Sequence, residues 1–337
     1  MKRKVGVFFD VFDPVITGHL NSALSAVRSL NLSLVLMVLL PGFARESAEN
    51  RWRMLVAACS VDKRMIPVCT EKENPSDSME YFRNLYPDDD LIILHGGIAP
   101  SAVHMEELTA AEVRLSSRNV CTPYFGISLP VYEYVMASGL YGISPRISCA
   151  PVWLEKLFSA LKPHRFAHSL SVAATARCLA ERFGENADKA EIAGLLHDCA
   201  KNLPLNEMRR IIEENGIAAD ERMMMQDSLL HSVAGACLIQ RDYGISDPEI
   251  IDAVASHNTG RPGMSRLSMC VCLADSIEPG REPYPHLDDI RRLAEKSLEK
   301  ALLLSLEGVQ AQVLSNGWYL HPRTRDTVAW LRSLQDA

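Results

Sequence analysis

Near Ser144-Pro145 the hydrophobic pattern of this 337-residue chain changes from alternating strand-like and helix-like segments to helices alone. Before that point, short apolar runs alternate with segments of helical spacing. Near-continuous apolar runs are typical of strands that are covered on both faces. The order predicts an open parallel sheet, whose ligands bind beyond the carboxyl ends of its strands. Strands are expected at residues 5–9, 34–40 and 91–94, and helices at residues 19–30, 49–59 and 76–85.

After Trp153 the strand signals disappear, and amphipathic helices follow one another. One helix is expected to end at Gly184, another to begin at Ser246-Asp-Pro-Glu249, and a third to end at Pro279-Gly280. We therefore predict two domains: an α/β domain over residues 1–145 and an all-α domain over residues 146–337, with a linker near residues 142–152.

Composition excludes several classes of protein. The chain has 35 Lys and Arg against 42 Asp and Glu, a net charge of −7, whereas general nucleic-acid binding needs a broad basic face. The longest apolar run, residues 34–40, is far shorter than the roughly 20 residues that cross a bilayer. The N-terminus lacks a signal-peptide pattern, and the nine cysteines form no CxxC pair. We expect a cytoplasmic protein without a disulfide framework or a membrane partner.

The most informative dipeptide is His197-Asp198, at the end of an apolar helix. Neighbouring ionisable groups are costly to bury unless a metal or a partner charge compensates them. Four similar residues occur on separate predicted helices, each toward a small or apolar face: His168, His231, His257 and Asp275. Four imidazoles and two carboxylates that converge in a helical bundle would suit iron, manganese or zinc, or a pair of such ions.

The order His168, His197-Asp198, Asp275 resembles the H…HD…D order of the HD-domain metal-dependent phosphohydrolases. Within that superfamily, five motifs resemble the bacterial symmetrical diadenosine tetraphosphatases. They occupy residues 165–170, 193–201, 230–236, 256–265 and 274–281. The resemblance implies an HD-domain helical bundle, iron at its centre, and cleavage of diadenosine tetraphosphate into two ADP.

The expected roles follow from the chemistry of these residues. A metal held by His168, His197, Asp198 and Asp275 would lower the pKa of a water and present hydroxide to phosphorus. His231 and His257 would either hold a second ion, our preferred interpretation, or contact phosphate. Manganese, zinc, cobalt and magnesium are the alternatives to iron. The expected catalytic residues are Asp198, Lys201, His231 and His257; the expected substrate-binding residues are Lys201, His231, His257, Thr259, Arg261 and Arg281.

A second motif, residues 12–20, directly follows the first predicted strand. It resembles the FDPxHxGH phosphate-binding turn of nucleotidyltransferases of the nicotinate mononucleotide adenylyltransferase type, which implies a Rossmann-like fold. Ile16 replaces the first histidine of that turn, and residues 115–121 depart from the family's ISSTxxR element. The resemblance places a degenerate nucleotide site at Asp13, Gly18, His19, Ser116 and Ser117.

The sequence therefore predicts a metal-dependent hydrolase of dinucleoside polyphosphates that carries a non-catalytic N-terminal domain. Two alternatives stay open: an HD phosphohydrolase of another nucleotide or alarmone, and a nucleotide-sensing regulator with a structural metal. The N-terminal domain is expected to dock against the hydrolase or to sense a nucleotide; a working adenylyltransferase and a structural spacer are the alternatives. A homodimer is left open.

Overall fold

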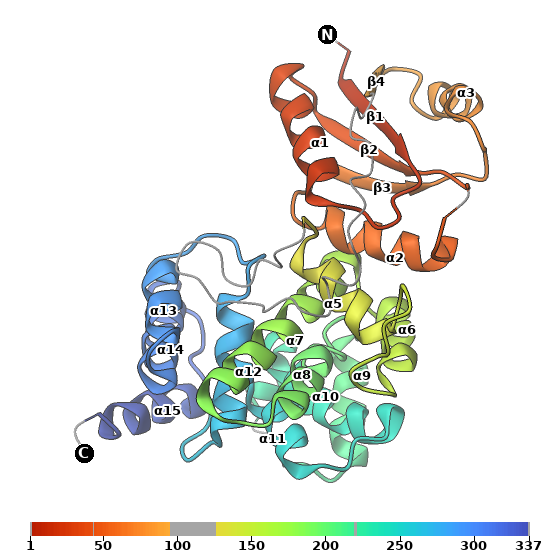
Figure 1. Ribbon diagram of the computed structural model, residues 1–337. Coiled ribbons are helices and arrows are strands. Elements are labelled where there is room, and N and C mark those ends of the chain that lie inside the picture. The colour runs from red at the N-terminus through yellow and green to blue at the C-terminus, as the bar shows by residue number, and fades with distance from the viewer. Residues whose placement is uncertain (1, 43, 95–125, 219–220, 336–337) are drawn as a thin grey trace. The chain divides into compact units, whose positions relative to one another are not determined.

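The computed structural model describes residues 2–42, 44–94, 126–218 and 221–335 (Figure 1). Among these residues, one compact unit ends at Arg146 and a second begins at Ile147. This division falls within the segment where the linker is expected. None of the described helices combines the length and the apolar character needed to span a membrane.

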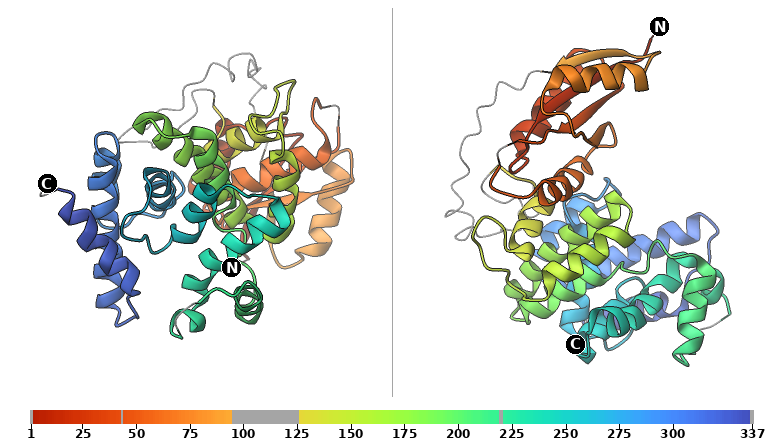
Figure 2. Two further views of the ribbon diagram at one scale, coloured as in Figure 1. Left: turned by 90° about the horizontal axis from the view of Figure 1, so that it is seen from below. Right: turned by 90° about the vertical axis from the view of Figure 1, so that its right-hand side faces the viewer.

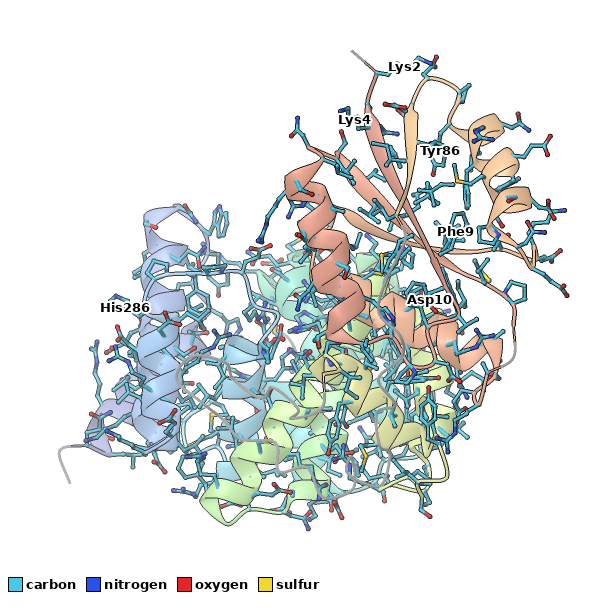
Figure 3. All side chains as sticks on the ribbon, turned by 45° about the horizontal axis from the view of Figure 1, so that its top comes forward. Lys2, Lys4, Phe9, Asp10, Tyr86 and His286 are labelled. Carbon is cyan, nitrogen blue, oxygen red and sulfur yellow. The ribbon has the colours of Figure 1, made fainter. Side chains whose placement is uncertain are left out.

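The described residues of the first unit form a sheet of four parallel strands in the order β3-β2-β1-β4. The strands are β1 (Lys4–Asp10), β2 (Leu34–Leu39), β3 (Met65–Cys69) and β4 (Asp90–Leu94), and the helices are α1 (Thr17–Ser29), α2 (Ala48–Cys59), α3 (Pro75–Leu85) and α5 (Leu129–Ser138). In Figure 3, Lys4 and Asp10 mark the two ends of β1. The predicted open parallel sheet with its helices is confirmed.

The central strands carry the core of this sheet. Val5, Val7, Leu36 and Val38 are buried against Met79 and Phe82 of α3. Strand β3 was not predicted, because Pro67 interrupts its apolar pattern. Pro67 is tolerated there because β3 pairs only with β2 among the described strands, so the missing N–H lies at a sheet edge.

The described part of the second unit is helical throughout, as predicted. Its helices are α6 (Ala150–Ala160), α7 (Pro163–Phe183), α8 (Ala187–Leu196), α9 (Leu205–Glu214), α10 (Asp227–Tyr243), α11 (Pro248–Ser256), α12 (Arg266–Ile277), α13 (Leu287–Ala294), α14 (Leu298–Ser315) and α15 (Pro322–Ser333), with a 3₁₀ turn at Met223–Met225. In both views of Figure 2 the blue helices α13, α14 and α15 pack as one group. The expected helix ends hold: α7 stops before Gly184, which adopts φ +76°, and α12 stops before Pro279-Gly280.

Helices α7 and α8 pack with their backbones in close approach, because α8 carries Gly194 at the contact. A Cβ atom at Gly194 would lie 2.9 Å from the Cα of Ala173 in α7. Helix α12 packs on both α7 and α8, and α11 packs on α8, α10 and α12. These contacts bring together the helix ends and faces that carry the histidines.

Candidate metal centre

Six side chains from five helical segments converge in the second unit. His168 lies on α7, His197 and Asp198 follow α8, His231 lies on α10, His257 follows α11, and Asp275 lies on α12. Their ligand atoms form three overlapping groups, and within each group the atoms lie within 4.8 Å of one another. His197, Asp198, His231 and His257 are buried, while His168 and Asp275 retain slight exposure.

Three of the imidazoles are oriented by the helix that carries them. The Nδ1 atoms of His197 and His257 donate to the carbonyls of Gly194 and Val254, at 2.7 and 2.8 Å. In the same way, the Nδ1 of His231 donates to the carbonyl of Asp227, at 3.2 Å. A carbonyl oxygen can only accept, so the hydrogen of each neutral ring is on Nδ1, and the lone pair on Nε2 faces the cluster.

His168 is oriented by a carboxylate instead. Its Nδ1 lies 3.0 Å from Oε1 of Glu278, whose Oε2 accepts from the N–H of Gly280 at 2.6 Å. The Nε2 of His168 lies 2.9 Å from Oδ1 of Asp275. Burial lowers the pKa of His168, but the hydrogen bonds with Asp275 and Glu278 outweigh burial and raise it above its usual value. Both ring nitrogens of His168 therefore face carboxylate oxygens.

The Nε2 of His197 is the clearest sign of a missing partner. It is fully buried and makes no hydrogen bond with any described residue. It lies 3.6 Å from Oδ2 of Asp198 and 3.8 Å from Oδ1 of Asp275. Burial lowers the pKa of His197, which keeps the ring neutral, the form that binds metal. Unpaired buried nitrogens are costly, and a divalent metal among these atoms would remove that cost. The residues thus fit a metal.

A second group faces the other oxygen of Asp198. The Nε2 of His231 lies 3.1 Å from Oδ1 of Asp198 and 3.2 Å from the Nε2 of His257. Burial, together with the neighbouring rings of His197 and His231, lowers the pKa of His257 to about 3. Asp198 therefore presents Oδ2 to one group of ligand atoms and Oδ1 to the other.

Three cations surround these ligands and are partly open to solvent. Nη1 of Arg165 donates to Oδ2 of Asp198 at 3.0 Å, Lys201 approaches His231, and Arg281 forms an ion pair with Asp275. Their side chains are 29%, 24% and 33% exposed, respectively. Sequence reasoning did not assign Arg165 to the site. Its position three residues before His168, about one turn away on the same helix, could have indicated that both side chains lie on the same face.

The structure does not bring every predicted residue to the cluster. Arg261 forms a two-point ion pair with Asp252, at 2.7 and 2.9 Å. Thr259 is buried, and its hydroxyl donates to the carbonyl of Gly260 at 3.0 Å. Within the described ranges neither residue makes a hydrogen bond or ion pair with the six clustered side chains, so a substrate contact for them stays a prediction.

The predicted N-terminal site is held together by its own residues. His19 is buried; its Nδ1 accepts from the N–H of Ile16 at 3.1 Å, and its Nε2 lies 3.4 Å from Oδ2 of Asp10. Asp13 accepts from the hydroxyl of Tyr141 at 2.7 Å. Gly18 lies in the first turn of α1. Ser116 and Ser117 lie outside the described residues.

The backbone at the start of α1 is also engaged. Both the N–H and the hydroxyl of Thr17 donate to the carbonyl of Gly126, the hydroxyl at 2.6 Å. Free N–H groups at a helix N-terminus are what a phosphate normally binds. Here the N–H of Thr17 already has an acceptor from its own chain.

Comparison with known proteins agrees with the geometry of the helical unit. A family model described as "HD domain" matches residues 165–280. A relative from Bacillus subtilis (strain 168), "Bis(5'-nucleosyl)-tetraphosphatase, symmetrical", is 40% identical over 173 residues, which cover 51% of this chain and 92% of the relative. The chain belongs to this HD-domain hydrolase family.

Two further comparisons extend this assignment. A solved chain described as "predicted HD superfamily hydrolase involved in NAD metabolism", from Clostridium acetobutylicum, is 38% identical to this chain, with a TM-score of 0.53. The match covers 55% of this chain and 97% of that chain. A "Probable nicotinate-nucleotide adenylyltransferase/Ap4A hydrolase" from Mycoplasma genitalium is 25% identical over 355 residues, which cover 92% of this chain and 99% of that protein. The two-part organisation is therefore shared with a relative of nearly the same extent.

Proposed function

We propose that the HD unit hydrolyses diadenosine tetraphosphate and related dinucleoside polyphosphates to two nucleoside diphosphates, with a metal centre that most readily takes iron. The observation that carries this proposal is the convergence of four imidazoles and two carboxylates beside three partly exposed cations. The family name of the Bacillus subtilis relative supports the choice of substrate.

The ligand residues would hold the ion in defined positions. His168, His197, Asp198 and Asp275 would hold one ion, and His231 and His257, with the second oxygen of Asp198, would hold another. A divalent metal, when bound, lowers the pKa of a water and neutralises charge on a phosphoryl oxygen. Nitrogen and oxygen donors without thiolate suit iron, manganese, zinc or cobalt better than calcium.

The surrounding cations would act on the phosphates. The polyphosphate bridge is an anion that needs compensation where it enters a buried site, and Arg165, Lys201 and Arg281 offer it. Charge develops on the leaving diphosphate as the bond to phosphorus breaks, and pre-positioned cations stabilise that charge. Glu278 orients His168 and thereby keeps its Nε2 toward the ion.

We further propose that residues 1–145 form a nucleotidyltransferase-like domain without adenylyltransferase activity, and that residues 146–337 form the hydrolase. The strand order β3-β2-β1-β4 and the turn that follows β1 support the fold. Ile16, at the start of α1, cannot donate a hydrogen bond to phosphate, and the N–H of Thr17 is occupied. Release of pyrophosphate from nicotinate mononucleotide and ATP by the full-length protein would contradict this proposal.

The hydrolase proposal is tested by metal analysis and product analysis on one preparation. Protein purified without oxygen should contain iron, should lose hydrolysis of diadenosine tetraphosphate on chelation, and should regain it with Fe²⁺ or Mn²⁺. Faster turnover of a guanosine alarmone or a nucleoside monophosphate would favour a different HD phosphohydrolase. Bound metal without turnover of any nucleotide would favour a regulator.

A further inference from the structure

Lys201 lies against one group of ligand atoms in the metal centre. Its Nζ is 3.1 Å from the Nε2 and 3.3 Å from the Nδ1 of His231, and 3.8 Å from Oδ1 of Asp198. These atoms belong to the group formed by Asp198, His231 and His257. No hydrogen bond or ion pair joins Lys201 to His168, His197 or Asp275 in the part of the chain that the structure describes.

The hydrogen on His231 decides what the lysine does there. Because the Nδ1 of His231 donates to the carbonyl of Asp227, the neutral ring accepts only at Nε2. The Lys201 ammonium is almost equally far from both ring nitrogens, so its charge lies against the ring, beside the Nε2 that a metal ion would use. The positive charge of Lys201 therefore already lies beside the ligand atoms of His231 and Asp198.

The ligand atoms of His168, His197 and Asp275, which we call the first group, differ from those of Asp198, His231 and His257, the second group, in two respects. The cations beside the first group, Arg165 and Arg281, contact carboxylate oxygens of Asp198 and Asp275, whereas Lys201 lies against an imidazole ring. Moreover, His168 is backed by the carboxylate of Glu278, whereas His231 and His257 are backed by neutral carbonyls. A carboxylate partner makes an imidazole a stronger ligand. Both differences favour a cation in the first group over the second.

We propose that Lys201 competes with the second metal ion, so that the centre holds one tightly bound ion at His168, His197 and Asp275 and one exchangeable ion at His231 and His257. This inference rests on the proposed metal-dependent function. The lysine thereby sets the number of ions that the centre holds at a given metal concentration, in addition to any contact with phosphate.

The experiment is a titration of the metal-free, full-length protein with Mn²⁺ alone. Isothermal titration calorimetry measures the affinity of each binding step, and electron paramagnetic resonance detects coupled Mn²⁺ ions. In the wild type, the second Mn²⁺ should bind much more weakly than the first. Lys201→Met should tighten the second binding step by about ten-fold or more, because a unit charge is removed from beside a divalent cation, and should leave the first step unchanged. The spectrum of coupled Mn²⁺ ions should then appear at lower metal concentration.

Two further variants serve as controls. Lys201→Arg keeps the positive charge and should keep the second step weak, whereas Lys300→Met removes an exposed lysine at the start of α14 and should match the wild type. If Lys201→Met unfolds, as judged by circular dichroism, Lys201→Gln replaces it. An unchanged or weaker second step in a folded Lys201→Met or Lys201→Gln protein would overturn the inference.

The same titration separates this inference from the function on which it rests. Two Mn²⁺ ions bound with equal affinity in the wild type would contradict the competition by Lys201 and leave the metal-dependent function standing. Absence of any bound Mn²⁺ in the wild type and in all variants would contradict both.

Discussion

At the scale of single residues, the metal centre depends on how each imidazole is fixed. His197 and His257 each immediately follow a helix, and each ring donates to a carbonyl three residues earlier, so the last turn of the helix orients the ligand. Burial keeps both rings neutral by lowering their pKa values. A neutral imidazole with Nδ1 protonated is the form that offers Nε2 to a metal.

Replacing the HD pair tests this arrangement. His197→Ala and Asp198→Ala should each lower metal content to near zero and hydrolysis by at least about 100-fold, because each of these side chains belongs to two of the three groups of ligand atoms. His286→Ala is the matched control: this histidine, labelled in Figure 3, precedes α13 and its side chain is 60% exposed. Metal content is measured by plasma mass spectrometry and folding by circular dichroism. Full metal occupancy in both HD variants would refute the ligand assignment.

The sequence pattern indicated the candidate metal-ligand residues more completely than the charged residues that contact them. Adjacent His197 and Asp198 stand out because two ionisable groups at the end of an apolar helix are costly to bury without a compensating charge. Arg165 carries an ordinary surface-type charge in the sequence, and only the folded structure shows that it faces the cluster. The pairing of Arg261 with Asp252 was equally hidden, because it depends on the turn after α11.

At the scale of elements, the distance between α7 and α8 places His168 relative to His197. Gly194 permits that distance, since an added Cβ would meet the Cα of Ala173 at 2.9 Å and the carbonyl oxygen of Val172 at 3.0 Å. Both of these neighbours are backbone atoms, so neither can move aside without shifting a helix. The glycine therefore links helix packing to the geometry of the site.

Gly194→Ala should lower the free energy of unfolding by about 1–3 kcal/mol, because the helices must separate. Gly308 offers a matched control within α14, since an added Cβ there meets nothing within 4 Å. Gly308→Ala should be neutral or stabilising by up to about 1 kcal/mol, because alanine has the higher helix propensity. Urea unfolding of both variants makes the comparison. Equal stability of Gly194→Ala and wild type would show that the α7–α8 contact is not tight.

Element prediction succeeded where the hydrophobic period was strong. The three apolar runs and the helix stops at Gly184 and Pro279 appear in the structure within a residue or two. Strand β3 was missed because it has only five residues, MIPVC, whose burial does not alternate cleanly, and among the described strands it pairs only with β2. Proline at the strand centre added a misleading signal.

At the scale of the whole molecule, we propose that the two units have separate roles. All six clustered side chains belong to the unit that begins at Ile147. A fragment of residues 146–337 should therefore fold, bind metal and hydrolyse diadenosine tetraphosphate at a rate within a few-fold of the full-length protein. Steady-state kinetics on both proteins check this expectation. A folded, metal-loaded but inactive fragment would mean that the N-terminal unit contributes to catalysis.

We propose that this HD centre divides a tetraphosphate bridge evenly. Attack on an inner phosphorus gives two ADP, whereas attack nearer one end gives AMP and ATP. The decisive measurement is hydrolysis of diadenosine tetraphosphate in ¹⁸O-labelled water, with mass spectrometry of the first products. We expect ADP alone, with one labelled ADP per turnover. AMP and ATP as primary products would contradict it.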